Sequence, residues 1–290
     1  MSLPENHRLP EPTDDTPGLN TQNQYKHSGK APLTGLLLAF AIGSIVSAGA
    51  GVLYCFLVTN LAFSMLKILI VFGFAACIGT PIGWIAKSFK VRSERPVLLA
   101  ALLAATIGLY FCWAFHPYFI SAEEQRFVAW KPTQIYEWSL KLFNAGRDYR
   151  GWFAVFVWTL EAGTIYLLGF GSAVSWIEQP FCERCNCWTE KRMGVAYYHP
   201  PPAAHPITKQ LLQNDARALL SCEPSDDQAE SYLRVDMAMC PRCLQTSFIS
   251  CRSIDQRNPQ KKGHYSPVEK IIMDKVIIDP ETLQSIIVAG

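Results

Sequence analysis

Four long apolar stretches constrain the fold of this chain more than any other feature. A helix needs about 20 mostly apolar residues to cross the roughly 30 Å of hydrocarbon in a bilayer. Each stretch approaches or exceeds that length, and charged residues make up only 17% of the 290 residues. The sequence therefore predicts a transmembrane domain over residues 32–177, an all-α four-helix bundle with spans at Pro32–Val58, Leu61–Ala86, Val97–Phe115 and Trp152–Ile177.

Basic residues between the apolar stretches predict the orientation of the chain. The connection after the second stretch is short and holds Lys87, Lys90, Arg92 and Arg95. Short loops rich in Lys and Arg stay in the cytoplasm. The third connection, residues 116–151, holds five Lys and Arg, but it is longer and less dense in charge. We therefore expect an integral membrane protein of a bacterial-type plasma membrane, with its N-terminus and its C-terminus both in the cytoplasm.

The segments outside the four stretches have their own patterns. Residues 1–31 are polar and hold several prolines, which predicts a disordered N-terminal tail, because they cannot bury enough apolar surface to offset the entropy of ordering. The outer loop, residues 116–151, is expected to carry two short interfacial helices. One begins at a capping box that runs from Ser121 to Glu124. The other covers Thr133–Asn144, and its wide apolar face predicts that it lies on the membrane surface or caps the bundle.

Small residues recur at every fourth position of the first apolar stretch and again in the second. This spacing lets the backbones of neighbouring membrane helices approach closely. We interpret the pattern as tight packing inside one bundle, and a homo-oligomer joined through these helix faces is the alternative. The residues are Gly35, Ala39, Gly43, Ser47 and Gly51 in the first stretch, and Ala75, Gly79 and Gly83 in the second.

Residues 178–290 have the pattern of a small cytoplasmic α+β domain. Apolar and polar residues alternate from Leu233 to Met239, as in a half-buried strand. Asp279 followed by Pro280 is typical of a helix start. We expect strands at Arg192–Tyr198, Leu233–Met239, Thr246–Ile254 and Val268–Ile278, a helix at Ile207–Cys222, and a closing helix that begins at Pro280.

Two Cys-x-x-Cys pairs give this domain its strongest chemical signal. They are Cys182 with Cys185, and Cys240 with Cys243. Four thiolates arranged in two such pairs are a common ligand set for one tetrahedral Zn²⁺ ion. A redox pair or four unligated thiols are the alternatives, and a reducing cytoplasm favours zinc over disulfides.

These paired cysteines, with strands expected on either side, resemble the zinc-ribbon class of domains over residues 180–255. The resemblance implies that all four thiolates bind one structural zinc ion. Arg184 and Arg242 lie within the pairs, where they could offset the negative charge of a four-thiolate site. Zinc ribbons often need a left-handed residue after the second cysteine of each pair. Asn186 tolerates that conformation and Leu244 does so poorly, so we expect the second turn to be irregular.

Five further Cys and His residues could in principle supply a second metal site. They lack paired spacing, so the preferred interpretation is that the cysteines are small buried apolar side chains and the histidines belong to a linker. These residues are Cys187, Cys222, Cys251, His199 and His205.

Two ionisable residues lie within the apolar stretches, Glu161 in the fourth and Lys67 in the second. An ionisable group inside hydrocarbon is costly and is a candidate functional site by default. We expect the two side chains to form an intramembrane polar pair in the outer half of the bilayer. This pair would be either purely structural or part of a transport path.

The net charge and the missing enzyme motifs exclude several classes of function. The net charge is +2, and residues 178–290 hold thirteen Lys and Arg against fourteen Asp and Glu, so nucleic-acid binding is not expected. The sequence contains no phosphate-binding loop and no hydrolase nucleophile motif. We expect a membrane-anchored scaffold whose zinc domain binds another protein. The alternatives are a small transporter or channel-like protein that uses Glu161 and Lys67, and a membrane-bound thiol enzyme.

Overall fold

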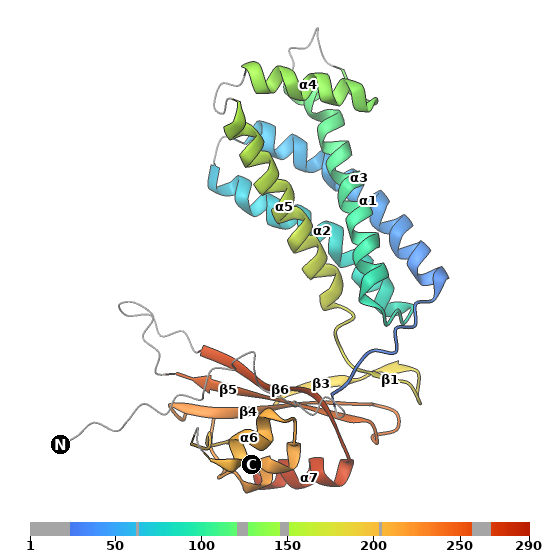
Figure 1. Ribbon diagram of the computed structural model, residues 1–290. Helices are drawn as coiled ribbons and strands as arrows, with labels where there is room; N and C mark the ends of the chain where they lie inside the picture. Colours follow the sequence, from blue (N-terminus) through green and yellow to red (C-terminus); the bar gives the residue numbers. More distant parts are fainter. Residues whose placement is uncertain (1–23, 62–63, 121–126, 146–150, 203–204, 257–267) are drawn as a thin grey trace, which may run out of the picture. The chain divides into compact units, whose positions relative to one another are not determined.

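The computed structural model describes residues 24–61, 64–120, 127–145, 151–202, 205–256 and 268–290. The chain divides into two compact units (Figure 1). Residues 28–178 form the helical unit. Residues 179–290, together with the described part of residues 1–27, form the sheet unit.

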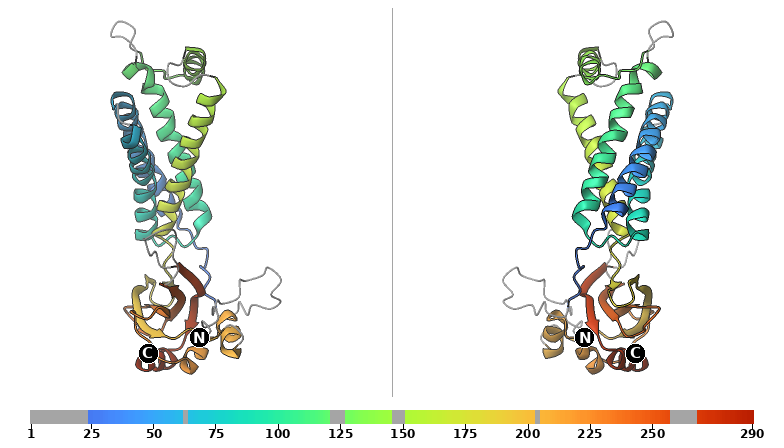
Figure 2. Two further views of the ribbon diagram at one scale, coloured as in Figure 1. Left: turned by 90° about the vertical axis from the view of Figure 1, so that its left-hand side faces the viewer. Right: turned by 90° about the vertical axis from the view of Figure 1, so that its right-hand side faces the viewer.

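The helical unit contains four helices that are long and apolar enough to cross a membrane. A shorter helix, α4, lies across the end of the bundle where α3 ends and α5 begins (Figure 2). The helices are α1 (Leu33–Asn60), α2 (Ser64–Ser88), α3 (Glu94–Ile120), α4 (Pro132–Ala145) and α5 (Trp152–Ser175).

The helices agree with the predicted stretches except at the ends of α3. This helix begins at Glu94 and runs to Ile120, whereas Val97–Phe115 was predicted. The acidic Glu94 in its first turn suits the positive end of the helix dipole, which explains the earlier start. The outer loop is correspondingly shorter. Helix α4 confirms the predicted helix at Thr133–Asn144, and the helix predicted from Ser121 falls outside the described residues.

The small residues of α1 face the interior of the helical unit. Gly35, Ala39, Gly43, Ser47 and Gly51 are all buried. A Cβ atom on Gly51 would overlap the carbonyl oxygen of Gly108 in α3. The pattern therefore serves close packing within one chain, as interpreted from the sequence, while a homo-oligomer through these faces stays a prediction.

Large apolar side chains cover the outside of the same helices. Ile45 is 73% exposed, Leu69 is 65% exposed and Leu167 is 73% exposed. Soluble proteins rarely leave extensive apolar surface in water. Small residues inside and large apolar residues outside are the arrangement expected of a bundle surrounded by lipid.

The sheet unit is built on an antiparallel sheet with the strand order β3-β4-β5-β6. A short hairpin, β1 with β2, precedes it. Three helical segments complete the unit, and α6 and α7 lie on one face of the sheet (Figure 1). The elements are β1 (Phe181–Cys182), β2 (Cys187–Trp188), β3 (Glu190–Tyr198), α6 (Pro206–Leu212), the 3-10 helix η3 (Ala216–Ser221), β4 (Ser231–Met239), β5 (Ser247–Asp255), β6 (Val268–Ile278) and α7 (Pro280–Ala289).

The alternating pattern of β4 positions the core of the sheet unit. Leu233 and Val235 point into a buried cluster that also contains Leu219 of η3 and Ile286 of α7. Helices therefore cover the face of β4 that carries its apolar residues. Asp279 caps α7 by accepting a hydrogen bond from the backbone N–H of Thr282 at 2.8 Å, and this bond lowers the pKa of the Asp279 carboxyl.

The single helix predicted over Ile207–Cys222 is wrong. The structure has α6 and η3 in its place, separated by Asn214 in a left-handed conformation with φ of 63°. Asn tolerates this conformation better than most residues. The next residue, Asp215, starts η3 by accepting a hydrogen bond from the backbone N–H of Arg217 at 3.1 Å.

Part of the predicted N-terminal tail belongs to the sheet unit. Gln24 pairs with Val276 of β6, and the backbone N–H of Tyr25 donates to the carbonyl of Lys275 at 2.9 Å. The Tyr25 ring packs edge-on against Phe248, with 4.9 Å between the ring centroids. These contacts differ from the disorder predicted for residues 1–31, because one aromatic ring and an open sheet edge suffice to hold a short polar segment. Residues 1–23 lie outside the described part, so disorder there stays a prediction.

Candidate functional site

The four paired cysteines converge on one point of the sheet unit. Cys182 and Cys185 lie on the β1–β2 hairpin, and Cys240 and Cys243 lie on the turn from β4 to β5. Their four sulfur atoms all lie within 4.8 Å of one another. The backbone N–H of Cys240 donates to the carbonyl of Thr246 at 3.0 Å and closes the second turn.

Both turns use the same backbone conformation after their second cysteine. Asn186 has φ of 52° and Leu244 has φ of 55°. The irregular second turn expected from Leu244 is therefore not found. Leu244 takes a conformation that leucine disfavours, and its N–H donates to the carbonyl of Cys240 at 3.1 Å. This hydrogen bond fixes the turn and brings Cys243 toward Cys240.

The sulfur geometry fits a metal ion better than a disulfide. With zinc–sulfur bonds of about 2.3 Å, the sulfur atoms of a tetrahedral site lie about 3.8 Å apart. The Sγ atoms of Cys182 and Cys243 are 3.9 Å apart, and all ten cysteines are free thiols. Cys182 and Cys240 are buried, whereas Cys185 and Cys243 are half-buried. Four thiolates could therefore hold one ion at the surface of the domain, with the inner two ligands shielded from water.

Hydrogen bonds at the second turn favour a thiolate. Backbone N–H groups of Gln245 and Thr246 lower the pKa of Cys243 to about 6. Arg184 donates to the side-chain oxygen of Gln245, and Arg242 donates to the carbonyl of Cys185 at 3.4 Å. Arg184 and Arg242 therefore each contact the opposite turn and bring positive charge to the cluster, as the sequence predicts.

A fifth cysteine, Cys187, also lies at the cluster. It lies opposite Cys182 in the register of the β1–β2 hairpin, and its Sγ lies 3.6 Å from the Sγ of Cys240. Thr246 contributes a hydroxyl 3.3 Å from the Sγ of Cys182. The sequence alone did not connect either residue with the site. Cys187 reaches the cluster because the register of the hairpin places it opposite Cys182, which its spacing from Cys185 alone does not show.

Known proteins give no further guidance. No family model, curated protein or solved structure matches this chain. Its function is therefore inferred from its own residues.

The structure does not bring the other candidate metal ligands into a second site. Among the described residues, the only cluster of Cys, His, Asp and Glu groups with metal-binding geometry is the one above. Cys251 lies in the core, and the Cys222 thiol donates to the carbonyl of Ala218 at 3.6 Å. His205 caps α6, and Nδ1 of His199 lies 3.5 Å from the Ser225 hydroxyl.

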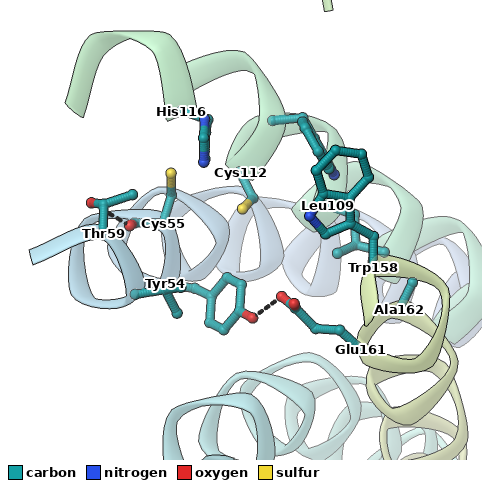
Figure 3. Close-up of a pocket in the computed structure, with 11 residues that line it drawn as sticks. Tyr54, Cys55, Thr59, Leu109, Cys112, His116, Trp158, Glu161 and Ala162 are labelled. Atoms are coloured by element: carbon teal, nitrogen blue, oxygen red, sulfur yellow. Dashed lines mark hydrogen bonds between the residues drawn. The ribbon is translucent and has the colours of Figure 1, made fainter. Parts of the chain in front are cut away.

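Glu161 has a partner that the sequence did not predict. The hydroxyl of Tyr54 in α1 donates a hydrogen bond to its carboxylate (Figure 3). No ion pair within 4.0 Å joins Lys67 to Glu161 among the described side chains, so their pairing stays a prediction. Tyr54 was missed because a tyrosine in an apolar helix has no spacing signal that links it to a carboxylate 107 residues away.

Proposed function

We propose that this protein is an integral membrane protein that holds a zinc-stabilised protein-binding domain in the cytoplasm. The observation that carries the proposal is the four-cysteine cluster, which joins two turns of the sheet unit in a chain that also contains four helices of membrane-spanning length. A tetrahedral site with four protein ligands has no open position for substrate. The role of the zinc is therefore structural, and this domain would unfold without it.

The cytoplasmic orientation rests on charge at one end of the helical unit. The last turn of α2 holds Lys87, the connection to α3 holds Lys90 and Arg92, and the first turn of α3 holds Arg95. The backbone N–H of Arg92 donates to the carbonyl of Lys30 at 2.8 Å, so the segment that leads into α1 lies at the same end. A short, densely basic end stays in the cytoplasm, which supports a plasma-membrane protein with both termini inside.

The sheet face opposite the helical segments is the proposed protein-binding surface. It carries Tyr197, Arg234, Arg252 and Ile271, where Ile271 is 59% exposed. Tyrosine and arginine are enriched at protein interfaces. Because their charges are already held by neighbouring acids, the two arginines are ordered before any partner arrives.

The ion pairs that order this surface are specific. Arg234 Nε lies 3.2 Å from Oδ1 of the buried Asp236, and Arg252 Nε lies 3.8 Å from Oδ2 of the same residue. Glu269 contacts both arginines, at 3.3 Å from Arg234 and 3.1 Å from Arg252. The arginine side chains are still 20% and 28% exposed, so part of each guanidinium or its stem is open to a partner.

Metal analysis of the purified full-length protein tests the structural centre. We expect one zinc ion per chain in the wild type, and loss of that ion with a fall in the unfolding temperature in Cys243→Ser. Cys222→Ser is the matched control, because its thiol is not part of the cluster and donates to a backbone carbonyl. A metal-free protein with the wild-type unfolding temperature would contradict the proposal.

Cross-linking in native membranes tests the interaction role. We expect Arg252→Glu to reduce the yield of the cross-linked partner at least tenfold while the zinc content stays unchanged. Arg217→Glu makes the same charge change at a 76% exposed position on η3, and it should leave the yield intact. Glu161→Gln should also have no effect. If Arg252→Glu leaves the cross-linked yield unchanged and Glu161→Gln abolishes solute uptake, the transporter alternative replaces this function.

A further inference from the structure

A cavity of about 140 Å³ lies within the helical unit, among α1, α3 and α5 (Figure 3). Tyr54 and Glu161 meet at one side of it, and His116 of α3 lies at the end toward α4. Trp113 and Trp158 also line it. The cavity is separate from the cysteine cluster, and the scaffold role proposed above makes no use of it.

Glu161 gives the cavity a negative charge when it is ionised, and no neighbouring cation in the lining neutralises it. The described lining residues include no Lys or Arg. Nδ1 of His116 accepts a hydrogen bond from the indole N–H of Trp138 at 2.9 Å. Because an indole N–H only donates, Nδ1 carries no proton and the His116 ring is neutral. Tyr54 supplies a hydroxyl donor to the carboxylate, which stabilises its ionised form.

The lining suits an organic cation better than a hard metal cation. Hard ions such as Ca²⁺ need six or more oxygen ligands. Only three side chains of the described lining, Tyr54, Thr59 and Glu161, carry oxygen, and the others are apolar, aromatic or thiol groups. Trp113 and Trp158 pack edge to face with 5.1 Å between their centroids. Aromatic rings attract alkylammonium ions.

The volume of the cavity limits the size of a ligand. An engineered protein cavity of about 150 Å³ accommodates benzene, which has six heavy atoms. We propose that this cavity binds a small alkylammonium ion of about five to seven heavy atoms, held by Glu161 and the aromatic rings of Trp113 and Trp158.

Equilibrium dialysis of labelled tetramethylammonium against the full-length protein in detergent tests the proposal. We expect saturable binding to one site per chain. Tert-butanol has a similar size and shape but no charge, so it should not displace the ion at equal concentration. Absence of saturable binding, as for a cavity that holds water only, would overturn the proposal, and so would equal competition by tert-butanol.

Three variants locate the site. Glu161→Gln should weaken binding at least tenfold, whereas Glu94→Gln, at an exposed position at the start of α3, should leave it unchanged. Glu161→Asp keeps the charge and should retain binding within a few-fold, which separates loss of charge from loss of fold. Wild-type affinity in Glu161→Gln would contradict the assignment.

Discussion

Leu244 shows how the chemistry of single residues sets the cysteine cluster. Its left-handed backbone brings Cys243 toward Cys240, although such a conformation costs about 1–2 kcal/mol for leucine. The four paired cysteines were predictable because their spacing is a local signal. Cys187 and Thr246 were not, since their sulfur and hydroxyl reach the cluster only through the register of the hairpin and the closure of the second turn.

Replacing Leu244 by glycine should stabilise the sheet unit. Glycine removes the left-handed strain, but it loses about 0.5–1 kcal/mol of that gain through the greater freedom of the unfolded chain. The Leu244 side chain is 55% exposed, so little burial is lost. We expect a net gain of up to about 1.5 kcal/mol, measured as a higher temperature of metal release. Leu244→Ala keeps the strain, so an equal gain in that variant would show that the backbone is not the cause.

Helices and strands were predicted well where their periodicity is local. The alternation of β4 and the length of the apolar helices identified these elements, and Asp279 with Pro280 marked the start of α7. The break at Asn214 was missed, because asparagine also occurs inside helices and the turn shows only in its backbone angle. The pairing of Gln24 with β6 was missed because one β-bridge leaves no repeating pattern.

The contact between α1 and α3 depends on Gly51. A methyl group there would meet the backbone carbonyl of Gly108, which cannot rotate away as a side chain would. We expect Gly51→Ala to destabilise the helical unit by about 1–3 kcal/mol, seen as a lower unfolding midpoint in detergent. Gly49→Ala is the matched control on the same helix, because nothing lies within 4 Å of the position that its added methyl group would take. Equal effects of the two changes would show that the close approach is unimportant.

At the scale of the whole molecule, composition predicted two parts and the structure contains two units. The sequence could not predict that Tyr54 would meet Glu161, since this contact depends on how α1 and α5 pack. It likewise could not predict a cavity among three helices, because each lining residue looks like ordinary bundle packing on its own.

Thiol labelling in intact cells tests the orientation. We expect a reagent that cannot cross membranes to label Glu137→Cys, at an exposed position on α4, and to label Ser28→Cys only after lysis. The basic residues at the connection from α2 to α3 are the physical reason. The parent chain, with its native thiols, gives the background. Labelling of Ser28→Cys alone in intact cells would reverse the orientation and expose the cysteine cluster to an oxidising space.

The backbone hydrogen bond between Tyr25 and Lys275 restricts how many times the chain between them can cross a membrane. Two segments that share a hydrogen bond occupy the same compartment, so the chain that leaves one and returns to the other must cross any bilayer an even number of times. Three or five crossings are incompatible with this bond, whatever the distribution of charge. The sheet unit is also discontinuous in sequence. During synthesis, β6 must therefore be complete before Gln24 and Tyr25 can pair with it.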